Sequence, residues 1–118
     1  ELRRRLEELD TDESAAARLR AVLVEMLPAG EGTADEAAHR LGTSKRSLQR
    51  ALTAEGTTFA KQLAHTRELL ARRYLATTHM PTEEIAYLLG YVEHNSFLRA
   101  FSAWTGTTPA KYRAAHAA

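Results

Sequence analysis

The sequence predicts an all-α domain of about seven helices, in which two helix-turn-helix units are joined by one long linker helix. Two observations lead to this prediction. Part of the chain repeats at an offset of about 48 residues, and apolar residues recur at helical spacing both within the copies and between them. The 118 residues, 44% of them hydrophobic, suffice for one domain or for two small helical units that share a core.

The repeat places the same pattern of acidic, small, apolar and basic residues in each half of the chain. Residues 35–42 (DEAAHRLG) return as 83–90 (EEIAYLLG), and residues 48–52 (LQRAL) return as 97–101 (FLRAF). The offset grows by one residue after the glycine, so the second copy has the longer turn. Two ordinary helical hairpins in one core are the alternative interpretation, and the matching arginines Arg50 and Arg99 make it the weaker one.

Small residues predict where two helices meet within each copy. Ala38 and Ala86 allow the helices to approach closely, and a glycine follows each alanine four residues later. Gly42 and Gly90 are therefore expected to adopt the positive φ that ends one helix and opens the turn to the next.

Caps and breakers indicate the helices of the first half. A first helix is expected over about residues 13–26, where an apolar stripe ends at a proline. Thr33 and Glu36 have the spacing of a capping box, which predicts a second helix from residue 34, and Ser44 caps the third.

A long helical pattern separates the copies, from the cap Thr58 to about Thr77. At about 1.5 Å per residue this helix would be roughly 28 Å long, comparable with the ~34 Å of one DNA turn. It could hold two reading units over successive major grooves, or it could be a core helix whose length is incidental.

The second copy is predicted to begin at Pro81, because a proline suits a helix start, where its missing N–H would have no partner. Its second helix is expected over about residues 93–104 and ends near Gly106. A short helix through Tyr112 and Arg113 is expected to close the domain.

The predicted organisation has an N-terminal part and a two-unit domain. The expected parts are residues 1–32 (N-terminal linker and first helix), 33–57 (first unit), 58–78 (linker helix) and 79–118 (second unit). The charged residues 1–10 are interpreted as the frayed end of a connection to an upstream segment.

Charge is distributed unevenly, although the net charge is only +1. Residues 1–43 hold six Lys/Arg and ten Asp/Glu, whereas residues 44–118 hold ten and five, a surplus of +5. The positive charge is concentrated where the second helix of the first copy begins, and so small a surplus is notable only together with the repeated motif.

Composition excludes several kinds of chemistry. There is no cysteine, so disulfides, thiolate metal sites and cysteine nucleophiles are absent. The five histidines are dispersed, and Ser44 and Ser47 have no nearby general base, so no metal site, cofactor or catalysis is expected. No apolar run approaches the roughly 20 residues of a membrane span, and the protein is expected to be soluble and cytoplasmic, without a membrane partner.

Buried stripes predict which side chains of the two repeated helices face solvent. If Leu48 and Leu52 are buried in one copy, and Phe97, Phe101 and Trp104 in the other, the opposite faces carry mostly polar residues. These are Lys45, Arg46, Gln49, Arg50 and Thr53 in the first copy, and His94, Asn95, Leu98, Arg99 and Ser102 in the second. Arginine can bind guanine, Asn and Gln can bind adenine, and a leucine can contact a thymine methyl. Ordinary solvated helices also carry such residues.

Three motifs together are highly specific: AA-x2-LGTS-x3-LQR at residues 37–50, EIA-x2-LGY at 84–91, and F-x-R-x-F-x2-W-x-G-x2-P-x2-YR at 97–113. With them, residues 33–113, about two-thirds of the chain, resemble the DNA-binding domain of the arabinose-operon regulator (AraC/XylS) family of bacterial transcription factors. The resemblance implies a seven-helix domain that places two recognition helices in adjacent major-groove segments on one face of double-stranded DNA.

The resemblance also implies which residues contact DNA. In the first unit these are Arg46, Gln49 and Arg50, with Ser44 and Lys45 near the backbone; in the second unit they are His94, Asn95, Ser96 and Arg99. Two residues depart from the family pattern. Val92 stands where a hydroxyl cap is usual, and Asn95 where a small serine is common.

The function expected from the residues and the resemblance is sequence-specific DNA binding by a regulator that activates transcription. RNA polymerase is a further expected partner, and an effector-sensing or dimerising domain is expected in an N-terminal region outside this chain. The alternative is a helical protein-interaction module that uses the same exposed faces to bind another regulator or RNA polymerase.

Overall fold

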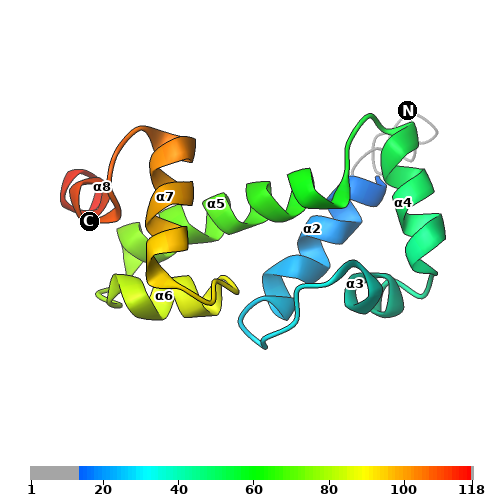
Figure 1. Cartoon of the computed structure of the whole chain (residues 1–118), viewed down its shortest axis with the longest axis horizontal. Helices are drawn as coiled ribbons and strands as arrows, with labels where there is room; N and C mark the ends of the chain where they lie inside the picture. Colours follow the sequence, from blue (N-terminus) through cyan, green and yellow to red (C-terminus); the bar gives the residue numbers. More distant parts are fainter. Residues whose placement is uncertain (1–13, 118) are drawn as a thin grey trace, which may run out of the picture.

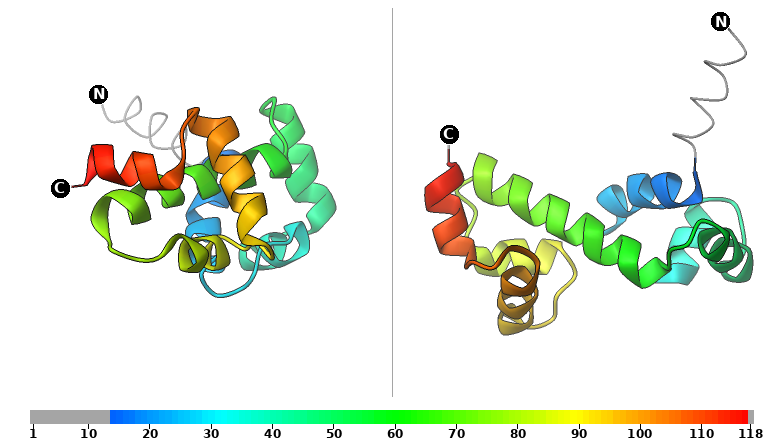
Figure 2. Two further views of the ribbon diagram at one scale, coloured as in Figure 1. Left: turned by 60° about the vertical axis from the view of Figure 1, so that its left-hand side comes forward. Right: turned by 90° about the horizontal axis from the view of Figure 1, so that it is seen from above.

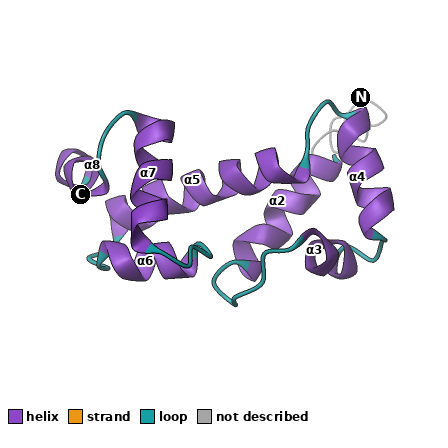
Figure 3. Ribbon diagram, in the orientation of Figure 1, coloured by secondary structure: helices purple, strands orange, loops and turns teal. Residues whose placement is uncertain are grey.

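The computed structural model describes residues 14–117, and over that range the chain forms seven helices and no strand (Figures 1 and 3). The helices are α2 (Ala15–Met26), α3 (Ala34–Arg40), α4 (Lys45–Ala54), α5 (Phe59–Thr77), α6 (Thr82–Leu88), α7 (His94–Thr105) and α8 (Pro109–His116). The predicted all-α architecture is confirmed. The expected helix start at residue 13 and the connection over residues 1–10 lie outside the described residues. No helix within the described range is long and apolar enough to cross a bilayer.

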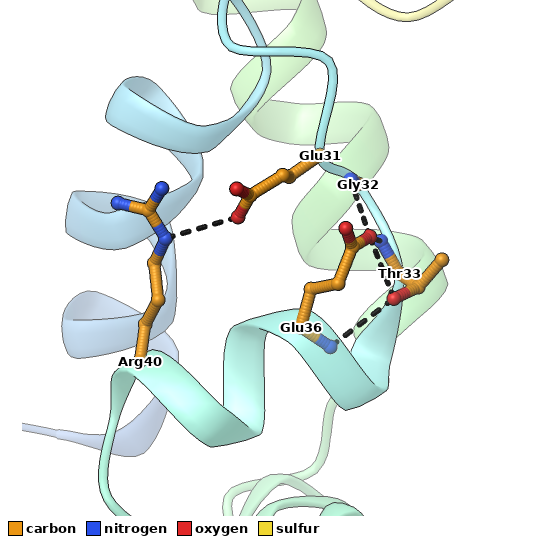
Figure 4. A network of polar contacts seen from close by, with 5 residues as sticks. All are labelled: Glu31, Gly32, Thr33, Glu36 and Arg40. Carbon is orange, nitrogen blue, oxygen red and sulfur yellow. Dashed lines mark hydrogen bonds and ion pairs between the residues drawn. The ribbon is translucent and has the colours of Figure 1, made fainter.

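A capping box begins α3, as the Thr-x-x-Glu spacing predicts (Figure 4). The Glu36 backbone N–H donates to Thr33 Oγ1 over 3.1 Å, and Glu36 Oε1 accepts from the N–H groups of Thr33 and Gly32 at 3.0 and 3.1 Å. The Thr33 hydroxyl also donates to Glu36 Oε1, and this bond, with the two backbone N–H groups, lowers the pKa of Glu36. An ion pair of 3.1 Å between Arg40 and Glu31 ties the end of α3 to the loop before it.

The two turns open on glycines in the left-handed region, which confirms their predicted role. Gly42 has φ +71° and Gly90 has φ +89°. In each turn the next residue donates its N–H to the buried alanine: Thr43 to Ala38 and Tyr91 to Ala86, both over 3.0 Å. The first part of both turns therefore has the same hydrogen bonding.

Two hydrophobic cores lie at opposite ends of α5. The first core is formed by α2, α3 and α4, and its fully buried members include Leu19, Leu23, Met26, Ala37 and Leu52. The second core is formed mainly by α5, α6 and α7, and its fully buried members include Ala71, Leu75, Ile85, Leu89, Phe97 and Phe101. In Figure 1, α5 runs from the group α2–α4 to the group α6–α8.

Side chains of α2 and α5 connect the two cores, and an arginine of α5 holds the second turn. Leu27, the C-cap of α2, is buried in the second core and Val24 of α2 packs against that core, while the other buried residues of α2 lie in the first. Leu63 of α5 packs against both. Arg67, also on α5, donates its Nε–H to the Leu89 carbonyl over 2.8 Å and lies over the Tyr91 ring at 4.6 Å. The two units are thus fixed relative to each other by packing as well as by the chain.

In this fold, α4 and α7 have similar orientations. They lie at opposite ends of α5 in Figure 1, and in the right-hand view of Figure 2 both are seen nearly end-on. Their axes are therefore roughly parallel. Because the two cores are braced together, the spacing of these helices is a property of the fold.

The first prediction concerns Gly42. No atom lies within 4 Å of a Cβ built there, so Gly42→Ala should destabilise the protein through backbone strain alone, by about 1–2 kcal/mol. Gly42→Asn should cost less, because asparagine tolerates the left-handed region. Urea unfolding measures both. Equal stability of Gly42→Ala and wild type would show that this turn does not require its φ.

The second prediction concerns the brace at Leu27. Leu27 is 2% exposed, so Leu27→Ala should lower the free energy of unfolding by about 2–5 kcal/mol. The matched control is Leu69→Ala on α5, where the side chain is 44% exposed, and the expected change is within about 0.5 kcal/mol. Similar small losses for both variants in urea unfolding would contradict the bridging role.

Candidate nucleic-acid interface

The position and rotation of α4 are set by a side-chain cap and by two buried leucines. Ser44 Oγ accepts the Ser47 backbone N–H over 3.0 Å and begins the helix. Leu48 and Leu52 are buried in the first core, four residues apart, which fixes the rotation of the helix. The residues on the opposite face are all exposed: Lys45, Arg46, Gln49 and Arg50. We call these four residues the α4 face.

The α4 face is strongly cationic. Within residues 14–117, none of its three cations forms a salt bridge, and no acidic residue lies in the first turn of α4. Arg46, Gln49 and Arg50 line an open surface hollow together with Thr53 and Ala54. The α4 face therefore offers unneutralised hydrogen-bond donors to a polyanion, and the buried leucines keep this face turned toward solvent.

The corresponding face of α7 is less exposed, and its side chains form hydrogen bonds with neighbouring side chains. Asn95 and Arg99 are exposed, whereas His94 and Ser96 are half-buried. His94 Nε2 lies 2.9 Å from the Thr82 hydroxyl on α6, and Arg99 donates to Ser96 Oγ over 3.3 Å. His94, Asn95, Ser96 and Arg99 are called the α7 face below. The structure thus brings the predicted residues of each unit onto one helix end.

Three expectations about α7 need correction. The N-cap is Glu93 rather than Val92, because the extra turn residue precedes the cap, and no side chain caps the helix. Leu98 is half-buried against the second core instead of lying on the open side, because α7 packs against both α6 and α8. Trp104 is only partly buried, with its ring centroid 6.4 Å from that of Phe101.

Thr82 is a residue of this site that the sequence pattern does not indicate. It is the first residue of α6, and its hydroxyl orients His94 across the turn. Nothing in its sequence surroundings indicates the pairing, because the two residues are twelve positions apart and meet only when α6 packs on α7. The same region is less cationic than the first unit, since Glu83 and Glu84 are exposed on α6 and Glu93 is exposed at the N-terminus of α7.

These features define a class of protein: a double helix-turn-helix domain, with two solvent-facing helices of matching build on a braced scaffold. Residues 37–115 match the helix-turn-helix domain family. The chain belongs to the AraC-type family of helix-turn-helix transcriptional regulators. It is therefore a DNA-binding domain of a transcriptional regulator, and the relatives that it matches are named as regulators, not as enzymes.

Curated relatives are transcriptional regulators. The chain is 43% identical over 107 residues to the ornithine utilization regulator of Pseudomonas aeruginosa, covering 91% of this chain and 31% of that protein. It is 32% identical over 100 residues to the transcriptional activator NphR of a Rhodococcus species, covering 85% of this chain and 30% of NphR. The chain thus spans about a third of the length of these relatives.

Solved structures share the fold. The DNA-binding domain of the global transcriptional factor AdpA, solved in complex with a target DNA, superposes with a TM-score of 0.68 and 25% identity, covering 86% of this chain and 91% of that one. An AraC-type regulator from Chromobacterium violaceum gives a TM-score of 0.77 at 21% identity, covering 92% and 96%.

Proposed function

We propose that this domain reads two adjacent major-groove segments on one face of double-stranded DNA, the first with α4 and the second with α7. The observation that carries the proposal is the pair of roughly parallel helices at opposite ends of α5, each with an exposed arginine at the matching position. The 19 residues of α5 correspond to roughly 28 Å. That length is close to the ~34 Å that separates equivalent groove segments.

Each residue of the α4 face has a chemical role in this proposal. Arg46, Gln49 and Arg50 meet base edges, where arginine suits guanine and glutamine suits adenine. Lys45 lies at the first turn and contacts the phosphate backbone, with Ser44 beside it. Because the Ser44 hydroxyl already accepts the Ser47 backbone N–H and donates to Ser47 Oγ, its proposed contribution to DNA contact comes from the neighbouring backbone.

The α7 face is proposed as the second reader. Asn95 and Arg99 are exposed and carry the donors for adenine and guanine. His94 has one ring nitrogen engaged with Thr82, which leaves Nδ1 for DNA. Ser96 accepts from Arg99, so its role is to orient that guanidinium as well as to contact DNA.

The parent protein is proposed to be a transcriptional activator that also contacts RNA polymerase and carries an effector-sensing or dimerising domain outside this chain. Two observations support this. The curated relatives are about three times as long as the stretch they share with this chain, and one of them is named a transcriptional activator.

The third prediction concerns the salt dependence of DNA binding. The surplus of +5 after residue 43 suggests about five neutralised phosphates, so log K should fall with log salt with a slope of about −4 to −5. Fluorescence anisotropy with labelled duplex DNA at several salt concentrations measures it. Tight binding with a slope near zero would overturn the electrostatic part of the proposal.

The fourth prediction tests whether both helices read bases. Arg50→Ala and Arg99→Ala should each weaken binding to a selected operator by about 1–3 kcal/mol, and each should relax base preference in only one of two clusters about 10 base pairs apart. The matched control is Arg73→Ala, which removes the same charge from an exposed residue of α5. It should weaken all sequences alike or not at all.

The measurement compares affinities for operators altered in each cluster. If Arg99→Ala leaves affinity and preference unchanged while Arg50→Ala destroys both, α7 is a structural or protein-binding element instead of a reader. If neither variant changes any preference, the two-groove proposal is wrong.

A further inference from the structure

The turn before α7 contains one residue more than the turn before α4, and hydrogen bonding identifies that residue as Val92. Thr43 and Tyr91 make equivalent bonds to Ala38 and Ala86, so the turns match up to this point. In the first unit the cap Ser44 follows at once. In the second unit Val92 is inserted before the cap Glu93.

The Val92 side chain is completely exposed, at 100%. An apolar residue just before a helix cap usually packs against the residue at the fourth helical position, which here is Phe97. That place is taken by Tyr91, whose ring centroid lies 5.7 Å from that of Phe97. Tyr91 is itself covered by the Arg67 guanidinium at 4.6 Å. The usual partner of such a residue is therefore occupied, and Val92 faces solvent.

A valine is an unusual choice for this position. Turn positions favour Gly, Pro, Asn, Asp and Ser, whose side chains or backbone freedom stabilise the turn. Val92 contributes no hydrogen bond and no core contact within the described residues, and it has no charge with which to bind a phosphate. What it offers is two methyl groups, held beside the N-terminal end of the helix that carries Asn95 and Arg99.

We infer that Val92 is a specificity-determining residue that packs its methyl groups against the 5-methyl group of a thymine in the DNA segment read by α7. The inference rests on the proposed function of α7 as a reader. In helix-turn-helix domains the N-terminal residues of the recognition helix meet the base edges, and Val92 lies two positions before the first residue of α7. An apolar side chain in the major groove distinguishes thymine by its methyl group.

The inference is specific to the second unit. The first turn has no inserted residue, and Thr43 lies directly before its cap. We therefore expect a turn residue to recognise a thymine methyl group only in the DNA segment read by α7. This is the segment whose base preference Arg99→Ala is expected to relax.

The experiment uses an operator selected from random duplex DNA with the wild-type chain. Each thymine in the α7 segment is replaced singly by deoxyuridine, which removes only the 5-methyl group, and affinities are measured for wild type, Val92→Ala and the control Leu69→Ala. Both substitutions shorten an exposed apolar side chain, and thermal unfolding confirms that both variants remain folded.

For wild type and Leu69→Ala, one deoxyuridine position should weaken binding about fourfold, the effect of one buried methyl group. For Val92→Ala the same substitution should have no effect. The inference is overturned if the α7 segment contains no required thymine, if no deoxyuridine weakens wild-type binding, or if the loss persists in Val92→Ala. A Val92→Ala loss that is equal for all sequences would indicate a sugar contact and would also overturn it.

Failure of the proposed function gives a different result. If the wild type selects no base preference in an α7 segment at all, the proposal that α7 reads DNA fails, and the Val92 inference fails with it. If Arg99→Ala relaxes preference in that segment while deoxyuridine substitution has no effect, only the Val92 inference is wrong.

Discussion

The packing of α2 against α5 is the constraint on which the rest of the structure depends. α2 places most of its stripe in the first core and its last apolar residue, Leu27, in the second, while Leu63 of α5 contacts both. A two-unit protein joined by a single helix could bend or twist at that helix. Here a second helix crosses the junction, so relative movement of the units would expose buried apolar surface, at about 25 cal/mol per Å². The distance between α4 and α7 is therefore part of the folded state, and the domain does not have to order it when it binds DNA.

The two units share one design but are not equivalent. α4 begins with a hydroxyl cap and carries three exposed cations, while α7 lacks a side-chain cap and has acidic residues nearby. Because counterion release scales with the number of neutralised phosphates, we expect the first unit to supply most of the salt-dependent affinity. In the proposed function, the second unit is therefore expected to depend more on contacts with base edges. Its Arg99 is held by Ser96 and its His94 by Thr82, so these donors lose less conformational freedom on binding than the free side chains of α4.

Features determined by neighbouring residues could be predicted from the sequence. The caps Thr33, Ser44 and Thr58 and the left-handed Gly42 and Gly90 follow from local chemistry, and each is present. The repeat also predicted the longer second turn. The predictions were less accurate where packing between helices decides the outcome.

Long-range contacts account for what the sequence did not predict. Leu98 has the spacing of an outward residue, yet it is half-buried because α7 has neighbours on two sides. The pairing of Arg67 with the Leu89 carbonyl joins residues 22 positions apart, and a helical pattern in α5 does not distinguish such an arginine from a solvated one. The family pattern places Val92 at the cap, because an inserted residue shifts the register by one, and the backbone hydrogen bonds show where the insertion lies. For the exposed site residues, the outward orientation follows from the buried stripe on the opposite side of the helix. Which bases they would contact depends on the sequence of the bound DNA.

This separation of buried and exposed residues explains how one scaffold can serve different operators. The residues that set the spacing of α4 and α7 are buried, and changes there are expected to cost several kcal/mol. The α4 and α7 faces are mostly exposed, and substitutions at such positions usually change stability by no more than about 0.5 kcal/mol. Arg46, Gln49 and Asn95 can therefore be exchanged for other donors with little effect on folding. His94 is an exception, because replacing it would also remove its hydrogen bond to Thr82, which joins α7 to α6. Selection for a new operator is thus expected to alter the α4 face more readily than the α7 face.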